Sequence, residues 1–302
     1  MAVLPNFIIP GAPKSGTTSL CNYLSQHPDI YIPQIKEPRF FVAEELMHVS
    51  AQDPMLPYLR KTSVFDWREY CDLYLNQERK IARGDASVQY LYYYENAIFR
   101  IKKRLGDVRI IIILRNPIER AFSNYVYQSM GVESSSCFSE ALGLEHVRKE
   151  DGFNSFWFYL EQGFYSRPVK AYMNAFSNVF VCLYDELKRD PLSLVQRMYE
   201  FLCVDSSFVP SVGARHNVSG VPKSLLLHNL INEPNFLVES AKRLFSKSVR
   251  KRIKRALAGL NLKPATLSSE EYDRLLMLYL GDLEELELIL GVDLREWKRL
   301  KV

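Results

Sequence analysis

The feature that most constrains this chain is a short loop near its start, Gly11–Thr18 (GAPKSGTT). An apolar run at 6–9 precedes the loop, and a helix is expected from Thr17 to about Gln26. Glycines let a backbone approach a bound group closely, and the amides at a helix N-terminus attract anions. Lys14 adds a positive charge and the two threonines add hydroxyl donors. The segment therefore predicts a site for a phosphate-like anion.

Two later apolar runs, Val108–Leu114 and Val179–Leu183, are rich in β-branched residues. Such runs are typical of strands that are buried on both faces of a parallel sheet. The first run leads into Asn116-Pro117 with Glu119 close behind, a pattern that marks the start of a helix. Residues 43–80 are rich in aromatic side chains and contain no clear strand.

Strands that alternate with helices predict an α/β fold with a central parallel sheet flanked by helices. We expect one domain over residues 1–302, with the motifs in a core of about 5–225. A helical and basic part, about 226–302, follows that core. The stretch 209–222 is interpreted as a functional loop rather than as a linker.

The composition, with 47% apolar and 25% charged residues, is that of a globular protein. A net charge of +4 suits an anionic ligand and gives no reason to expect nucleic acid. No apolar run approaches the roughly 18 residues of a membrane span, and the first residues lack a signal peptide's basic segment. We therefore expect a cytoplasmic protein. Five scattered cysteines without a CxxC pair predict neither a disulfide framework nor a zinc site.

The loop differs from the Walker loop of kinases and other P-loop NTPases, in which lysine directly follows the last glycine. Here the lysine, Lys14, stands two residues before Gly16. A kinase would also need an aspartate at the end of an apolar strand to hold magnesium, and Asp185 is the candidate for that role. The kinase reading therefore stays as a remote alternative.

The loop instead resembles the 5′-phosphosulfate loop, close to GxxKSGTT, of the sulfotransferases that use 3′-phosphoadenosine-5′-phosphosulfate (PAPS). A second motif agrees, because Ile112–Pro117 (IILRNP) followed by Arg120–Ser123 (RAFS) resembles the 3′-phosphate motif of that family. Arg115 follows a strand and can bind a phosphate with two parallel hydrogen bonds. Ser123 lies two helical turns beyond Asn116 and so shares a face with the start of the helix.

Further segments extend the resemblance over about residues 5–225. Lys36–Phe41 (KEPRFF) is similar to a segment of the glycan and bacterial branches, which include the heparan sulfate enzymes. Gln162–Tyr165 and Leu183–Leu187 also match segments of those enzymes. Asn217–Lys223 resembles the late loop that closes over the nucleotide.

The resemblance implies PAPS as the sulfuryl donor and 3′-phosphoadenosine-5′-phosphate (PAP) as the product, with no metal. The implied nucleotide-binding residues are Lys14, Ser15, Gly16, Thr17, Thr18, Arg115, Ser123, Ser219, Gly220 and Lys223.

The same resemblance implies two catalytic residues. Lys14 would stabilise the oxygen that bridges sulfur and phosphorus as their bond breaks. Glu37 would be the general base that takes the proton of the acceptor. A solvent-facing glutamate is the plain alternative for Glu37, and His216 is the alternative base.

One position departs from the glycan enzymes. Their EKTPxY-like segment carries a lysine that helps to hold the sulfuryl group, and Ala86 stands there in this chain. Either Lys36 or Arg39 compensates, or the chain belongs to a bacterial branch without that lysine. Asp85 and Ser87 are further candidates for contacts with the acceptor, and Asp85 could equally be structural.

The acceptor is expected to be a hydroxyl, with a carbohydrate favoured and a lipid, polyketide or amine left open. Eight lysines and arginines between Lys242 and Arg255 could form a basic surface for an acidic glycan, an anionic membrane or a carrier protein, or only a solvated helix face. A module that binds the nucleotide without catalysis is the remaining alternative.

Overall fold

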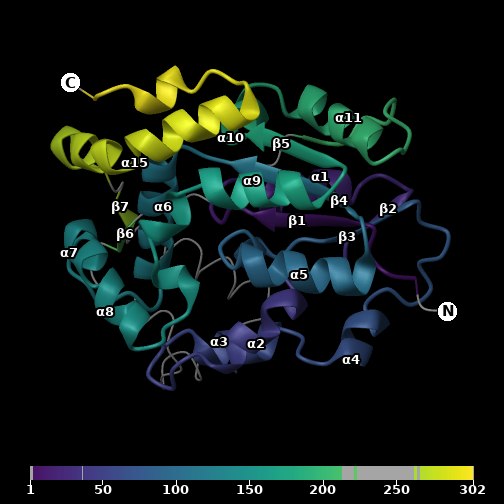
Figure 1. Ribbon diagram of the computed structural model, residues 1–302, viewed down its shortest axis with the longest axis horizontal. Coiled ribbons are helices and arrows are strands. Elements are labelled where there is room, and N and C mark those ends of the chain that lie inside the picture. The colour runs from purple at the N-terminus through teal and green to yellow at the C-terminus, as the bar shows by residue number, and fades with distance from the viewer. Residues whose placement is uncertain (1–2, 36, 213–220, 223–261, 264–265, 302) are drawn as a thin grey trace, which may run out of the picture.

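The centre of the protein is a five-stranded parallel sheet with the order β2-β3-β1-β4-β5. The computed structural model, shown in Figure 1, describes residues 3–35, 37–212, 221–222, 262–263 and 266–301. The sheet confirms the predicted fold class. Its strands are β1 (Phe7–Gly11), β2 (Ile30–Tyr31), β3 (Ala82–Asp85), β4 (Arg109–Leu114) and β5 (Val179–Leu183).

Strand β4 explains why a continuous apolar run belongs in the middle of the sheet. Ile110 and Ile112 face one core cluster, Ile111 and Ile113 face the other, and all four are fully buried. Because successive side chains of a strand point to opposite faces, a strand covered on both sides must be apolar at every position. The two strand predictions for residues 108–114 and 179–183 are confirmed.

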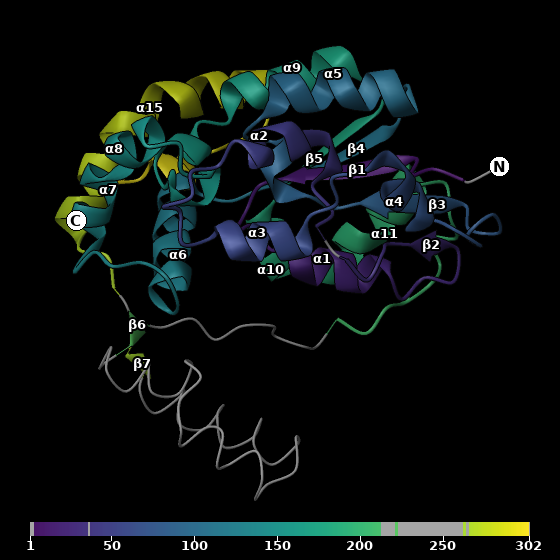
Figure 2. The same cartoon turned by 90° about the horizontal axis from the view of Figure 1, so that it is seen from below.

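Helices cover both faces of the sheet, as Figure 2 shows from the side. One layer contains α5 (Tyr94–Leu105), α9 (Ser166–Ala175) and α15 (Ser269–Leu290). The other contains α1 (Thr17–Leu24), α10 (Tyr184–Arg189) and α11 (Pro191–Phe201).

The remaining elements lie around these layers, and residues 43–80 form helices and loops without a strand, as predicted. They are α2 (Ala43–Met47), α3 (Leu56–Thr62), α4 (Trp67–Asp72), α6 (Pro117–Ser129), α7 (Phe138–Gly143), α8 (Glu145–Glu150), the antiparallel pair β6 (Val221–Pro222) and β7 (Leu262–Lys263), and the 3₁₀ turns η1 (Phe40–Val42), η2 (Val88–Tyr90), η3 (Ser155–Trp157), η4 (Glu161–Gly163) and η5 (Arg295–Lys298).

Helix α6 begins where the sequence predicts. The Asn116 side chain accepts hydrogen bonds from the backbone N–H groups of Ile118 and Glu119 at 3.0 and 3.2 Å, and Pro117 is the first helical residue. This cap satisfies amides that have no partner within the helix. Helix α1 ends at Leu24 rather than near Gln26, because the chain tightens into a turn before Pro28.

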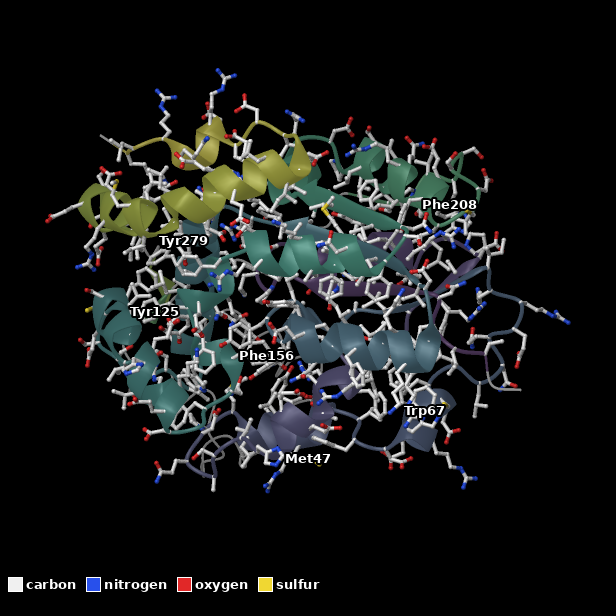
Figure 3. All side chains as sticks on the ribbon, in the orientation of Figure 1. Met47, Trp67, Tyr125, Phe156, Phe208 and Tyr279 are labelled. Atoms are coloured by element: carbon white, nitrogen blue, oxygen red, sulfur yellow. The ribbon has the colours of Figure 1, made fainter. Side chains whose placement is uncertain are left out.

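Helix α15 extends the core toward the far end of the chain. Tyr279, labelled on α15 in Figure 3, is fully buried and donates a hydrogen bond to the carbonyl of Leu160 at 2.7 Å. Tyr272 of the same helix meets the cap of α6, because its hydroxyl lies 2.9 Å from Asn116 Nδ2, the donor. These contacts fix α15 to the elements that surround the carboxyl ends of the strands.

The close contact of β1 and β3 gives a test of the packing. Gly84 lies opposite Phe7, and a Cβ at Gly84 would overlap the Phe7 ring. We expect Gly84→Ala to lower the free energy of unfolding by about 1–3 kcal/mol, the usual cost of overpacking. Gly281→Ala on α15 is the control, because a Cβ there meets open space and alanine favours a helix by about 0.5–1 kcal/mol. Urea unfolding measures both, and an unchanged Gly84→Ala protein would contradict the packing.

Candidate active site

The predicted anion site lies at the carboxyl edge of the sheet. After β1 the chain forms β2 and then β3 on one side of that strand, and it then crosses to β4 and β5 on the other side. In open parallel sheets, ligands bind outside the carboxyl ends of the strands where the direction of strand order reverses. In Figure 1 the strand arrows run toward α6, which stands at this edge.

The loop after β1 is shaped by two glycines. A Cβ at Gly11 would lie 2.7 Å from Leu91 Cβ, and Gly16 has a φ of 92° with the Tyr184 ring beside it. Helix α1 then starts at Thr17, so its first amides face the loop. Ser15 is fully buried, and its Oγ has no hydrogen-bond partner among the described residues. An unpaired hydroxyl beside a helix N-terminus fits a bound phosphate oxygen.

The two motifs of the sequence meet in space. Arg115, directly after β4, donates from Nη1 to the carbonyl oxygen of Lys14 at 3.2 Å. Its guanidinium also pairs with Glu119 at 3.1 Å and lies 5.0 Å from the ring of Tyr184. Residues 101 positions apart therefore line one side of the loop, and their cationic groups suit an anionic ligand.

One side of helix α6 faces this loop with a row of three side chains. Glu119, Ser123 and Tyr127 follow each other at four-residue spacing and so share a side of the helix. The first contacts Arg115, and the third lies under the Lys14 ammonium, whose Nζ is 3.9 Å from the ring centroid. Half-buried Ser123 lies between them in this row. Arg120 of the same motif points elsewhere: it is fully buried and donates to the carbonyl of Tyr159.

Glu37 is held by an ion pair. Arg39 Nη2 lies 2.5 Å from Glu37 Oε2, and Nη1 donates to Thr62 Oγ1 at 3.0 Å. The Glu37 side chain is 17% exposed and that of Arg39 is 1% exposed, so the carboxylate is the accessible member of the pair. The Glu37 carboxylate is thus partly exposed and is paired with a buried arginine.

Phe156 connects the Glu37 region with α6. Its ring centroid lies 5.7 Å from Arg39 Cζ, and its carbonyl accepts a hydrogen bond from Asn124 Nδ2 at 2.8 Å. Figure 3 labels Phe156 between α6 and α5 in projection. Asn124 stands one turn before Tyr127, the partner of Lys14. Glu37 is thus connected to α6 through Arg39 and Phe156, and Lys14 contacts the same helix at Tyr127.

Asp85 and Ser87 form a buried cluster instead of an acceptor surface. Both are fully buried. Asp85 accepts hydrogen bonds from Ser87, Tyr70 and Tyr90 at 2.7, 2.9 and 2.8 Å. Burial raises the pKa of Asp85 to about 6 against the lowering effect of these donors, and the charge of Glu37 adds to the rise. These contacts are internal, as the structural alternative for Asp85 expects, and contact with an acceptor stays a prediction.

Whether Arg39 compensates for the lysine that is absent at position 86 stays a prediction. Ala86 is buried, and the guanidinium of Arg39 is already used for Glu37 and Thr62. The other candidates lie outside the described residues: Lys36, His216, Ser219, Gly220, Lys223 and the basic stretch Lys242–Arg255.

A separate cavity of about 760 Å³ lies between α5, α9 and α15. Pro13, Tyr92, Tyr93 and Tyr94 are among the residues that line it. Its charged lining is mostly acidic, with Glu161 and Asp282 among the carboxylates. Carboxylates repel an anionic nucleotide, so this cavity does not suit one.

Within the described ranges, no cluster of three or more histidine, cysteine, aspartate or glutamate side chains is placed to hold a metal ion. Asp185, the candidate magnesium ligand of the kinase alternative, pairs with Lys188 at 2.6 Å and accepts from Trp297 Nε1 at 2.8 Å. In the part of the chain that the structure describes, no helix has the length and apolar character needed to cross a bilayer.

A model of the sulfotransferase family matches residues 5–207. The chain belongs to this family. The match spans both anion-binding motifs and the Glu37 segment, so the recognised resemblance is confirmed and the kinase alternative is removed.

Relatives agree with this family. Carbohydrate sulfotransferase 15 of Mus musculus is 27% identical over 168 residues, which are 45% of this chain and 29% of that protein. Bifunctional heparan sulfate N-deacetylase/N-sulfotransferase 4 of Mus musculus is 26% identical over 208 residues, 67% of this chain and 22% of that protein. This chain therefore spans less than a third of the length of these two curated relatives. The crystal structure of a sulfotransferase from Alicyclobacillus acidocaldarius has a TM-score of 0.76 and 28% identity, and the match covers 98% of this chain and 100% of that one.

Sequence reasoning missed the residues that support the site. Thr62, Phe156 and Tyr70 carry no motif and come from segments far from the residues they contact. Tyr127 could have been found from the sequence, because it stands one helical turn beyond Ser123 and so lies on the same side of the helix.

The buried carboxyl of Asp85 predicts a pH effect on stability. Its pKa is about 6 in the folded protein against an ordinary 3.8, so the folded state binds the proton more tightly. That contribution favours folding below about pH 4 and is lost as the pH rises through about 6. Relative to Asp85→Asn, we expect the unfolding free energy of the native protein to increase between pH 7 and pH 4, by up to roughly 3 kcal/mol. Urea unfolding across this range measures the difference, and the opposite slope would contradict the assignment.

Proposed function

We propose that this chain transfers the sulfuryl group of PAPS to an acceptor hydroxyl. The observation that carries the proposal is the contact of Arg115 with the Lys14 carbonyl, which joins two anion-binding motifs at the sheet edge of a sulfotransferase-family chain. PAPS supplies an activated sulfuryl group and leaves as PAP. The buried Ser15 hydroxyl, the α1 N-terminus and the two cations form a lining that fits its phosphates.

The nucleotide would be held from two sides. The loop from Lys14 to Thr18 would bind the 5′-phosphate end with backbone amides and hydroxyls, and Arg115 with Ser123 would bind the 3′-phosphate. Ser219, Gly220 and Lys223 remain proposed contacts from the late loop.

Catalysis would divide between a cation and a carboxylate. The acceptor oxygen forms a bond with sulfur while the bond between sulfur and the phosphate oxygen breaks. Lys14 would stabilise the negative charge that develops on the departing oxygen. Glu37 would take the hydroxyl proton, and its accessible position beside buried Arg39 supports that role. His216 is the alternative base.

We propose a carbohydrate as the acceptor. Support comes from relatives whose names include carbohydrate and heparan sulfate sulfotransferases. An acceptor screen should also include lipids, polyketides and amines. Transfer to one of these classes and not to a carbohydrate would contradict the proposal. The cytoplasmic location and the use of the basic stretch Lys242–Arg255 as a contact surface stay predictions.

Binding of PAP tests the nucleotide class. A ligand that binds only the folded protein stabilises it, by about 2.7 kcal/mol at one hundred times its Kd. We expect PAP to raise the melting temperature, with little change from AMP or from ATP plus magnesium. Arg115→Met should reduce the PAP shift, whereas Arg60→Met, at an exposed position on α3, should not. Stabilisation by ATP and magnesium but not by PAP would contradict the proposal.

Turnover tests the two catalytic residues. We expect Lys14→Ala and Glu37→Gln each to lower kcat by roughly 10²-fold or more, because each removes an interaction of the transition state. PAP should still stabilise Glu37→Gln, since this change leaves the phosphate loop intact. The measurement is transfer of ³⁵S from labelled PAPS to a carbohydrate pool, and near-native kcat in either variant removes the role of that residue.

A further inference from the structure

The guanidinium of Arg39 is fixed on several sides. Nη2 contacts the Glu37 carboxylate at 2.5 Å, and Nη1 donates to Thr62 Oγ1 at 3.0 Å and to the Glu37 carbonyl at 3.2 Å. The rings of Tyr58 and Phe156 lie 5.6 and 5.7 Å from Cζ, within the range of cation–π attraction. A side chain held in this way has little rotamer freedom left, and it can hold its carboxylate partner in one place.

The backbone of Arg39 is fixed by a second set of contacts. Its N–H donates to Ser87 Oγ at 3.0 Å, and Ser87 donates to Asp85, which also accepts from Tyr70 and Tyr90. Arg39 has a φ of 54°, which is uncommon for a residue with a side chain. Such a conformation persists where the surroundings determine it, and here the buried cluster around Asp85 supplies the contact.

A purely packing role explains this arrangement poorly. Burying an ion pair costs desolvation, and apolar residues of similar size usually stabilise a protein as well or better. Here only the arginine is fully buried, while its partner Glu37 keeps 17% of its side chain exposed. A buried cation and the hydroxyls around Asp85 thus hold one partly exposed carboxylate in place.

We propose that Arg39, supported by the Asp85–Ser87 cluster, is the positioning residue that holds the Glu37 carboxylate toward the acceptor hydroxyl. This inference rests on the proposed function, in which Glu37 is the base. It assigns one task to three residues for which the sequence analysis had separate roles: Arg39 at the sulfuryl group, and Asp85 and Ser87 at the acceptor. Arg39 acts through Glu37 and does not touch the transferred group.

A double-mutant cycle tests the proposal through kcat. The variants are Arg39→Met, Glu37→Gln and the two together, and the assay is ³⁵S transfer from PAPS to desulfated heparin. Misplacement of a catalytic group by about 1 Å can cost on the order of 10² in rate, so Arg39→Met should lower kcat by about that factor in the native background. With Glu37→Gln already present, the same change should cost less than about threefold, because the two residues act as a unit.

Controls separate positioning from folding. Arg39→Lys should recover about tenfold of the loss, because lysine keeps the charge but not the fork of donors. PAP should raise the melting temperature of every variant as it does that of the native protein. Arg60→Met, an exposed arginine on neighbouring α3, should keep native kcat. If Arg39→Met fails to fold, Ser87→Ala, which removes the acceptor of the Arg39 N–H, replaces it in the cycle.

The outcomes distinguish the two proposals. If the fold losses in kcat of Arg39→Met and Glu37→Gln multiply in the double variant, the positioning role of Arg39 is overturned. A fully active Glu37→Gln protein, or native protein without transfer to the probe, instead counts against the proposed function. The contact is then tested by ¹⁵N NMR of the Arg39 Nη protons. These protons should exchange slowly with water in the native protein and faster in Glu37→Gln. If in the native protein they exchange as fast as those of Arg60, the proposal is overturned.

Discussion

The parallel pairing of β1 with β4 is the constraint on which the site depends. Because the two strands run in the same direction, the loop after Gly11 and the arginine after Leu114 emerge at the same edge of the sheet. The contact between Arg115 and the Lys14 carbonyl follows from that pairing, although 101 residues separate the two. The isoleucines of β4, buried on both faces, keep the strand at the centre and so keep the edge in place.

The chain separates its charges around this edge. Lys14 and Arg115 line the phosphate loop, while the neighbouring cavity behind Pro13 is lined mainly by carboxylates. Glu37 has its own cation, Arg39, which is buried behind it. The loop is thus suited to the negatively charged donor that we propose, and Glu37, the proposed base, lies in a separate ion pair.

Several features could be predicted because they depend on local sequence. The strands at 108–114 and 179–183 follow from continuous β-branched runs, and the start of α6 follows from Asn116 and Pro117. The surroundings of Arg39, Asp85 and Ser87 could not be predicted. Their residue types allow contact with an acceptor, but residue type does not determine burial. Here Thr62 and Tyr70, from segments without a motif, supply the partners.

The sequence by itself determined the α/β fold, the family and the residues of the anion loop, because strand runs, helix caps and a contiguous loop are encoded by neighbours in the chain. Only the tertiary structure decided which polar side chains face the site. Thr62 of α3, Ser87 at the start of η2 and Phe156 of η3 converge on Arg39 when the helices pack against the sheet. That convergence depends on distances between segments dozens of residues apart, which the residue types of a segment do not encode.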